Sequence, residues 1–218
     1  SEDSLVSVPA IISPQLPRSA RDPHVASQNA YAAHVAHSQS HDPRSVLWRR
    51  QNAVLVEEAR QNGVDAAITL LWEISEQGRA ASQNFNQVVS LLASDGRLQD
   101  GLDLALEAGR RNFANIITFR PLMKLCCASG DGRAAKRVWR AMVDCGVEGD
   151  MFLYAELMGA LVRSQDTVSA ERVLQSLNES GRRPHIVLFN TLLKGVAKQA
   201  NVQQAFNVFD SIIEAGVR

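Results

Sequence analysis

This sequence of 218 residues lacks several features that mark common protein classes. Its three cysteines, Cys126, Cys127 and Cys145, form no CxxC pair, so we expect reduced thiols rather than a disulfide framework. It contains no apolar run of the about 18 residues that a membrane span requires. Its 23 basic and 23 acidic residues give a net charge of zero. That balance argues against a large, unspecific phosphate-binding surface, although it permits a local basic groove.

Motifs of enzyme chemistry are missing as well. The sequence has no phosphate-cradling glycine loop, no HExxH motif and no aspartate cluster that could hold the metal ions of a nuclease. His34, His37 and His41 share one helical face, but no cysteine or well-placed carboxylate completes a tetrahedral metal shell. We therefore predict a protein that is not an enzyme, with no cofactor, no metal site and no small-molecule substrate.

Residues 1–44 differ in composition from the rest of the chain. They contain five of the seven prolines and none of the thirteen glycines. Such a segment cannot build a core, so we expect an extended, largely irregular tail held by protein subunits of a larger complex. The sequence opens on Ser1 rather than methionine, which is consistent with a removed targeting peptide and equally with a trimmed chain.

The rest of the sequence repeats with a period of 34 to 35 residues. Phe85, Phe119, Tyr154 and Phe189 follow one another at offsets of 34, 35 and 35. A second register places a small residue four before a second, mostly larger apolar one: Ala67–Leu71, Gly101–Ala105, Ala135–Trp139, Ala170–Leu174 and Ala205–Phe209. Periods of this size are typical of stacked helical hairpins, because one hairpin cannot bury its apolar face alone.

These repeats predict an all-α solenoid of about five helix-turn-helix hairpins, spanning 45–81, 82–115, 116–150, 151–185 and 186–218. In the degenerate first hairpin we expect Val54, Leu55 and Ala59 to face inward and the exposed side to be polar, as in an end cap. In the last hairpin we expect Leu192, Phe209 and Ile213 to be covered by further chain or by a partner. Pro121 is expected in the first turn of its helix, where a missing N–H is harmless.

Two stretches resemble the pentatricopeptide repeat. One is Ile186–Gly195 (IVLFNTLLKG) with QAFNVF at 204–209 and EAGV at 214–217; the other is ITFRPLMKLCC at 117–127 with AAKRVWRAM at 134–142 and CGV at 145–147. The 35-residue period also favours this family over the tetratricopeptide repeat, whose period is about 34 and whose Trp and Leu-Gly landmarks are missing here. The resemblance covers roughly residues 50 to 218 and implies a location in a mitochondrion or plastid.

The resemblance also implies RNA-contacting residues along the first helix of each hairpin. The base-reading pairs would be Asn86 with Asn115, Arg120 with Asp150, and Ala155 with His185, while Asn190 lacks a partner. The stacking positions would be Ile117, Phe152 and Val187, with Gln83 departing from the apolar pattern. The basic residues that could follow a phosphate backbone are Arg120, Lys124, Arg163, Lys194 and Lys198.

Each of these assignments has a structural alternative. Asn86 and Asn190 could be amides that satisfy a free backbone N–H near a helix start. Arg120 could form an ion pair with Asp150, and the basic residues could belong to a solvated face. Only the Asn86–Asn115 pair has the usual readout chemistry, which in the family favours pyrimidines. One such position, at about 1–3 kcal/mol of discrimination, cannot specify a site.

Two functions follow from the sequence. The first is a non-catalytic RNA-associated protein with weak sequence preference for single-stranded or structured RNA, serving as a subunit of an organellar ribosome or RNA-processing complex. The second is a protein–protein scaffold whose solenoid grips a helix or peptide in its concave face and contacts no RNA. Arginines on second helices, such as Arg137 and Arg140, mark the opposite side, where structured RNA or a protein could dock.

Overall fold

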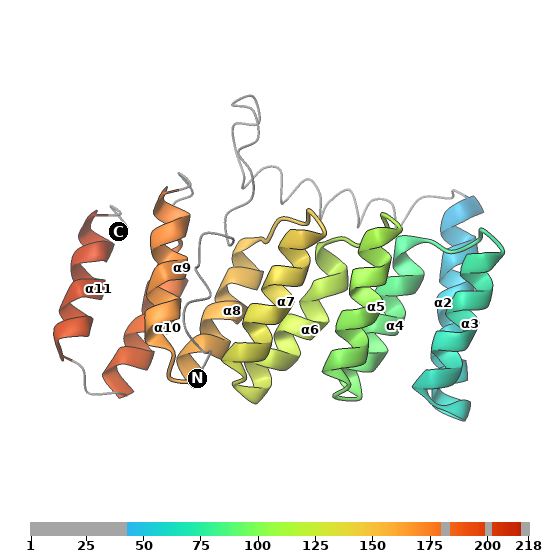
Figure 1. Cartoon of the computed structure of the whole chain (residues 1–218), viewed down its shortest axis with the longest axis horizontal. Helices are drawn as coiled ribbons and strands as arrows, with labels where there is room; N and C mark the ends of the chain where they lie inside the picture. The colour runs from blue at the N-terminus through green and yellow to red at the C-terminus, as the bar shows by residue number, and fades with distance from the viewer. Residues whose placement is uncertain (1–42, 180–183, 199–201, 215–218) are drawn as a thin grey trace, which may run out of the picture. The chain divides into compact units, whose positions relative to one another are not determined.

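The computed structural model describes residues 43–179, 184–198 and 202–214, and all regular structure within these ranges is helical (Figure 1). Its helices are α2 (Pro43–Asn62), α3 (Val64–Glu76), α4 (Ser82–Ser94), α5 (Leu98–Arg110), α6 (Ile116–Ser129), α7 (Gly132–Asp144), α8 (Met151–Arg163), α9 (Thr167–Glu179), α10 (Ile186–Lys198) and α11 (Val202–Glu214). The predicted all-α solenoid of helical hairpins is confirmed. Residues 1–42 of the predicted tail lie outside the described residues. Helix α2 begins at Pro43 and therefore includes the last two residues of that predicted tail.

The chain divides into two compact units whose boundary falls within α6. We refer to the described residues up to 122 as the N-terminal unit and to those from 123 onward as the C-terminal unit. In the N-terminal unit, α4 packs against α2, α3 and α5. In the C-terminal unit, α8 packs against α7, α9 and α10, and α10 also packs against α9 and α11. The first helices α8 and α10 therefore lie side by side, and the second helices α7, α9 and α11 pack onto them.

The helix ends repeat as regularly as the helices. A residue with left-handed backbone, φ between 59° and 75°, follows six of the helices: Gly78, Gly96, Asn112, Gly130, Gly146 and Gln165. Its N–H and that of the next residue bond back to the last turn, as in Gly96 to Ala93 at 3.2 Å and Arg97 to Leu92 at 2.9 Å. Gly181 and Gly216, which follow Gly146 at intervals of 35 residues, lie outside the described residues.

The core contains the aromatic register and the second register apart from Ala205 and Phe209. Phe85, Phe119, Tyr154 and Phe189 are all buried. Tyr154 of α8 meets Trp139 of α7 with ring centroids 4.5 Å apart, and Phe85 of α4 meets Trp72 of α3 at 5.9 Å. The aromatic residue of a first helix thus packs on the second helix of the hairpin before it, which couples each hairpin to its predecessor.

One glycine sets how closely the first helices approach in the C-terminal unit. A Cβ atom at Gly195 of α10 would lie 2.5 Å from Cγ1 of Val162 in α8, which is closer than non-bonded carbon atoms can come. The absence of a side chain here therefore brings α8 and α10 into direct contact. None of the described helices combines the length and the apolar character needed to cross a membrane.

The predicted polar cap of the first hairpin is wrong in part. Leu55 is fully buried as expected, but Val54 is 50% exposed. Val46, Leu47 and Val56 of α2 are also exposed. Adjacent helical residues lie about 100° apart, so Val54 and Leu55 cannot both face the single stripe of α2 that meets α3 and α4. Aliphatic side chains therefore alternate with the predicted polar ones on the outside of α2.

The prediction for the last hairpin is also only partly right. Leu192 is fully buried, because it lies between α9 and α11 rather than on the outer face. Phe209 is 56% exposed, although its counterparts Trp139 and Leu174 are buried. The side chain of Ile213 is not among those described. The apolar face of α11 is thus narrower than the sequence predicts.

Pro121 lies in the interior of α6 rather than in its first turn, because the helix already begins at Ile116. At this depth its missing N–H removes a hydrogen bond to the carbonyl of Ile117, and a proline in a helix interior typically costs about 3 kcal/mol. We expect Pro121→Ala to raise the free energy of unfolding by about 1–2 kcal/mol, the remainder being offset by the freer unfolded chain. Urea denaturation would measure the change. Unaltered or lower stability would show that the proline is accommodated without strain.

The buried alanines provide a test of the packing. Ala170 of α9 is fully buried, so the carboxylate in Ala170→Glu would enter the interior without a partner. We expect the variant to lose several kcal/mol of stability and to unfold at moderate temperature. Val168→Glu is the matched control, because Val168 lies on the exposed side of the same helix and should tolerate the same charge. Thermal unfolding followed by circular dichroism separates the two. Equal stability would contradict the placement of α9.

Candidate nucleic-acid interface

The exposed side of α10 presents four of the predicted RNA-contacting residues in one row. Val187, Asn190, Lys194 and Lys198 are spaced three, four and four residues apart, which keeps them on one helical face. All four are exposed, and Val187 retains 49% of its accessible surface. The row therefore offers an apolar side chain, an amide and two ammonium groups in order along the helix.

The neighbouring helix α8 has a row in the same register. Its members Phe152, Ala155, Gly159 and Arg163 each precede their α10 counterparts by 35 residues. Phe152 is 73% exposed, the highest fraction among the described large apolar side chains. Because α8 and α10 pack side by side, two apolar side chains stand at the starts of adjacent helices, and the cationic groups follow two to three turns further on.

Arg163 is less available than the lysines. Its guanidinium donates hydrogen bonds from Nη1 to the carbonyl oxygen of Cys127 and, at 3.0 Å, to the Cys127 sulfur. The side chain thus ties the end of α8 to the end of α6 within the C-terminal unit. Lys124, also in this unit, is exposed on α6. The lysines are therefore the cationic residues best placed to follow a phosphate backbone.

The predicted pair Asn86 and Asn115 is brought together in the N-terminal unit. Asn86 Nδ2 donates to Asn115 Oδ1 at 3.4 Å, and the Thr118 hydroxyl donates to Asn86 Oδ1 at 2.6 Å. The Asn115 side chain also accepts from the Ile117 N–H at 2.9 Å, so it caps the start of α6. Asn86 is only 8% exposed. Both amides therefore take part in a hydrogen-bond network that links α4 to α6.

Thr118 was not among the residues predicted from the sequence. Its hydroxyl donates to Asn86 and accepts from the Asn115 N–H at 2.9 Å, and the residue is fully buried. Asn115 and Thr118 are three residues apart at a helix start, a spacing that resembles a capping pattern. This spacing was the sequence feature from which a role of Thr118 could have been predicted. The contact with Asn86, 32 residues earlier, had no sequence signal.

The remaining predicted positions have other surroundings. Asp150 accepts from the Leu153 N–H at 2.9 Å and caps α8. His185 accepts from the Val187 N–H through Nδ1 at 3.3 Å. Arg120, like Ile117 and Gln83, is half-buried in the N-terminal unit, whereas Asp150 belongs to the C-terminal unit. Ala155, half-buried on α8, offers no hydrogen bond to a base.

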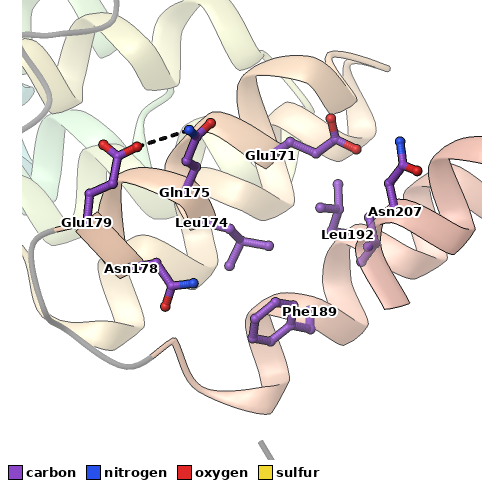
Figure 2. Close-up of a pocket in the computed structure, with 9 residues that line it drawn as sticks. Glu171, Leu174, Gln175, Asn178, Glu179, Phe189, Leu192 and Asn207 are labelled. Carbon is purple, nitrogen blue, oxygen red and sulfur yellow. Dashed lines mark hydrogen bonds between the residues drawn. The ribbon is translucent and has the colours of Figure 1, made fainter. Parts of the chain in front are cut away.

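A cavity of about 460 Å³ lies between α9, α10 and α11 (Figure 2). Leu174, Phe189 and Leu192 form its apolar part, while Glu171 and Glu179 stand at its rim. Gln175 donates to Glu179 at 3.0 Å across this rim. The described residues that line the cavity include no lysine or arginine, and the carboxylates of Glu171 and Glu179 disfavour phosphate groups.

Two titratable groups of the C-terminal unit have shifted pKa values. Burial raises the pKa of the Cys126 thiol to about 11, so this cysteine is protonated at neutral pH and is a poor nucleophile. Burial alone would raise the pKa of Asp166, but hydrogen bonds from Lys136 and Ser169 outweigh it and lower the pKa. In the part of the chain that the structure describes, no three His, Cys, Asp or Glu residues are placed to hold a metal ion. His34, His37 and His41 lie outside it.

Comparison with solved structures places this arrangement among known helical repeats. The PPR domain of Arabidopsis thaliana protein-only RNase P 1, solved in complex with tRNA, has a TM-score of 0.56 and 18% identity, over 81% of this chain and 92% of that one. The pentatricopeptide repeat protein PPR10 in complex with an 18-nt psaJ RNA element has a TM-score of 0.50 and 19% identity, over 87% of this chain and 35% of that one. The present chain therefore spans about a third of the PPR10 chain.

The fold is an α-solenoid of helical hairpin repeats, as in these solved structures. Family models agree in sequence: the pentatricopeptide repeat domain matches residues 137–199 and 172–218, and the PPR repeat matches residues 117–147. Residues 117–218 thus consist of pentatricopeptide repeats, as the sequence predicts. Among curated proteins, no sequence match was found.

The network around Thr118 generates a stability prediction. Thr118→Val leaves the buried Asn86 oxygen and the Asn115 N–H without their partner, and a buried polar group left unpaired costs about 1–3 kcal/mol. We expect a loss of that size in the free energy of unfolding, measured by urea denaturation. Asn190→Ala is the control, because Asn190 is exposed and should leave stability unchanged. Wild-type stability of Thr118→Val would show that the network adds nothing to the coupling of α4 and α6.

Proposed function

We propose that this chain is a non-catalytic RNA-associated protein that binds single-stranded RNA along the exposed face of α8 and α10. The observation that supports this most directly is the exposure of Phe152 and Val187 at the starts of two adjacent first helices. Large apolar side chains are normally buried, and here both lie where the repeat family stacks bases. The solved relatives bound to tRNA and to the psaJ element make RNA the natural ligand to test.

The energetics of the proposed surface are those of weak, stacking-led binding. A base stacked on an aromatic ring contributes about 1–3 kcal/mol, irrespective of its identity. Lys194 and Lys198 add contacts to phosphates that weaken as salt rises. Asn190 is the only amide in the two rows, and Ala155 contributes no hydrogen bond. The proposed surface would therefore hold RNA without reading a long sequence.

Such weak sequence specificity suits a subunit of a larger ribonucleoprotein better than a protein that recognises one transcript on its own. We propose an organellar ribosome or RNA-processing complex, in a mitochondrion or plastid, as its setting. The neutral net charge supports this setting, since a free-standing binder would need a stronger electrostatic attraction to RNA. The non-catalytic role rests on the absence of catalytic motifs from the sequence, and the proline-rich residues 1–44 would contact neighbouring protein subunits.

Substitution of the exposed phenylalanine tests the proposed surface. We expect Phe152→Ala to weaken binding of a mixed-sequence single-stranded RNA about fivefold to tenfold, because one stacked base loses its platform. Phe206→Ala is the matched control, since Phe206 is exposed on the second helix α11 and lies outside the proposed surface. Fluorescence anisotropy at several salt concentrations measures both variants, and Lys194→Ala with Lys198→Ala should reduce the salt dependence. Equal affinities for Phe152→Ala and Phe206→Ala would refute the proposal.

A protein-binding scaffold is the second candidate, and one observation favours it. The outside of α2 exposes Val46, Leu47, Val54 and Val56 between charged residues, and exposed aliphatic side chains in a row are typical of protein contacts. Crosslinking of the protein in its native extract distinguishes the two. RNA crosslinked to peptides of α8 and α10 supports the first candidate, while protein crosslinks alone, on α2 and on those helices, support the scaffold.

A further inference from the structure

The second helix α7 exposes a row of cations that the proposed function does not use. Arg133, Lys136, Arg137 and Arg140 follow at i, i+3, i+4 and i+7, and all four are exposed. The opposite side of α7 is firmly packed, since Ala134, Ala135, Val138, Trp139 and Met142 are buried. The row is therefore held in one orientation and extends for about 10 Å along the helix.

Among the described second helices, α7 alone has a net positive charge. The second helices α3 and α5 are acidic: α3 contains three acidic and no basic residues, and α5 contains three acidic residues and one arginine. Helix α9 contains Glu171, Arg172 and Glu179. On α7 the only acidic residue is the terminal Asp144. A helix face that contacts only water does not require charges of one sign. The four cations of α7, on a protein with zero net charge, therefore indicate an anionic partner.

Ion pairs leave the charges at the two ends of this row uncompensated among the described residues. In the N-terminal unit Arg97 pairs with Asp65 and Asp100, each at 2.7 Å. On α7, Lys136 pairs with Asp166 at 2.9 Å, but Arg133 and Arg140 form no ion pair with any residue that the structure describes. Two guanidinium groups at the two ends of the row thus remain available, and their planar donors suit phosphate oxygens.

The row also lacks the apolar component of other recognition surfaces. Every exposed large apolar side chain among the described residues lies outside α7. Single-stranded RNA is held partly by stacking, and protein interfaces are centred on aromatic or aliphatic groups. A surface of cations alone matches a partner that presents only phosphates and sugars. In base-paired RNA the bases are hidden, and the backbone is what a protein meets.

We infer that the exposed face of α7 binds the sugar–phosphate backbone of base-paired RNA, with Arg133 and Arg140 as the principal contacts. The inference rests on the proposed association with RNA, but not on the α8–α10 surface. The chain would then have two RNA surfaces of different chemistry: a stacking surface for unpaired nucleotides and a purely electrostatic one for a helix.

The test uses the full chain and two probes, a blunt RNA duplex of about 20 base pairs and a single strand of the same length. We expect Arg133→Gln with Arg140→Gln to weaken duplex binding about tenfold and to reduce the slope of log affinity against log salt by about two. Binding of the single strand should change less than twofold. Arg49→Gln with Arg50→Gln is the control, because it removes two exposed charges from α2.

Four outcomes would overturn the inference. Unchanged duplex binding would exclude α7, and an equal loss in the α2 control would show an effect of net charge alone. Binding of polyglutamate but not of duplex would make α7 a site for acidic proteins. Loss of single-strand binding alone would indicate that these arginines act together with the α8–α10 surface. Photo-crosslinking of the unaltered chain to the duplex gives an independent readout, which should fall on residues 133–140. If only the duplex binds, the α8–α10 proposal fails and this inference stands.

Discussion

The interaction on which this structure depends is the packing of an aromatic residue of a first helix against the second helix of the preceding hairpin. Trp139 with Tyr154 and Trp72 with Phe85 are the clearest cases, with ring centroids 4.5 and 5.9 Å apart. The same contact decides what faces solvent. A residue two positions before the aromatic lies about 200° around the helix. Burial of Tyr154 and Phe189 therefore turns Phe152 and Val187 outward.

This division gives the two helix layers of the C-terminal unit different chemistry. The exposed row of α10 combines an apolar side chain with an amide and two lysines, whereas the exposed row of α7 contains cations alone. The buried residues of α7 and α10 lie on the other side of each helix from these rows. The composition of the exposed rows is thus free to serve binding. The rim of the cavity between α9 and α11 is acidic, so its charge is opposite to that of both rows.

The sequence was sufficient to predict the helical hairpins, the period and the family, because the buried landmarks recur at fixed spacing. The errors fall where a landmark is missing or where a neighbour decides the outcome. The first hairpin has no recurring aromatic, so Val54 was assigned to the wrong face of α2. Leu192 was expected at an outer face but is buried between α9 and α11.

The predicted site shows the same limit. The family resemblance paired Asn86 with Asn115 as base-reading residues, and the two side chains are hydrogen-bonded to each other. It could not reveal Thr118 between them, because the distance at which α4 approaches α6 is not encoded in any local pattern. Nor could it reveal that Arg163 is anchored to Cys127, since that contact joins residues 36 positions apart.

The burial of Asn86 has a consequence for how this repeat array can change its ligand. At Asn190 a new side chain alters only what solvent or a nucleotide meets. At Asn86 the same exchange also removes a hydrogen bond that joins two hairpins. A substitution that changes which base this position binds would therefore also change how firmly the two hairpins are held together. Any base that used this amide would have to replace the bonds it displaces. Changes of ligand in evolution or in the laboratory should therefore begin at exposed positions such as Asn190, where a substitution leaves the contacts between hairpins intact.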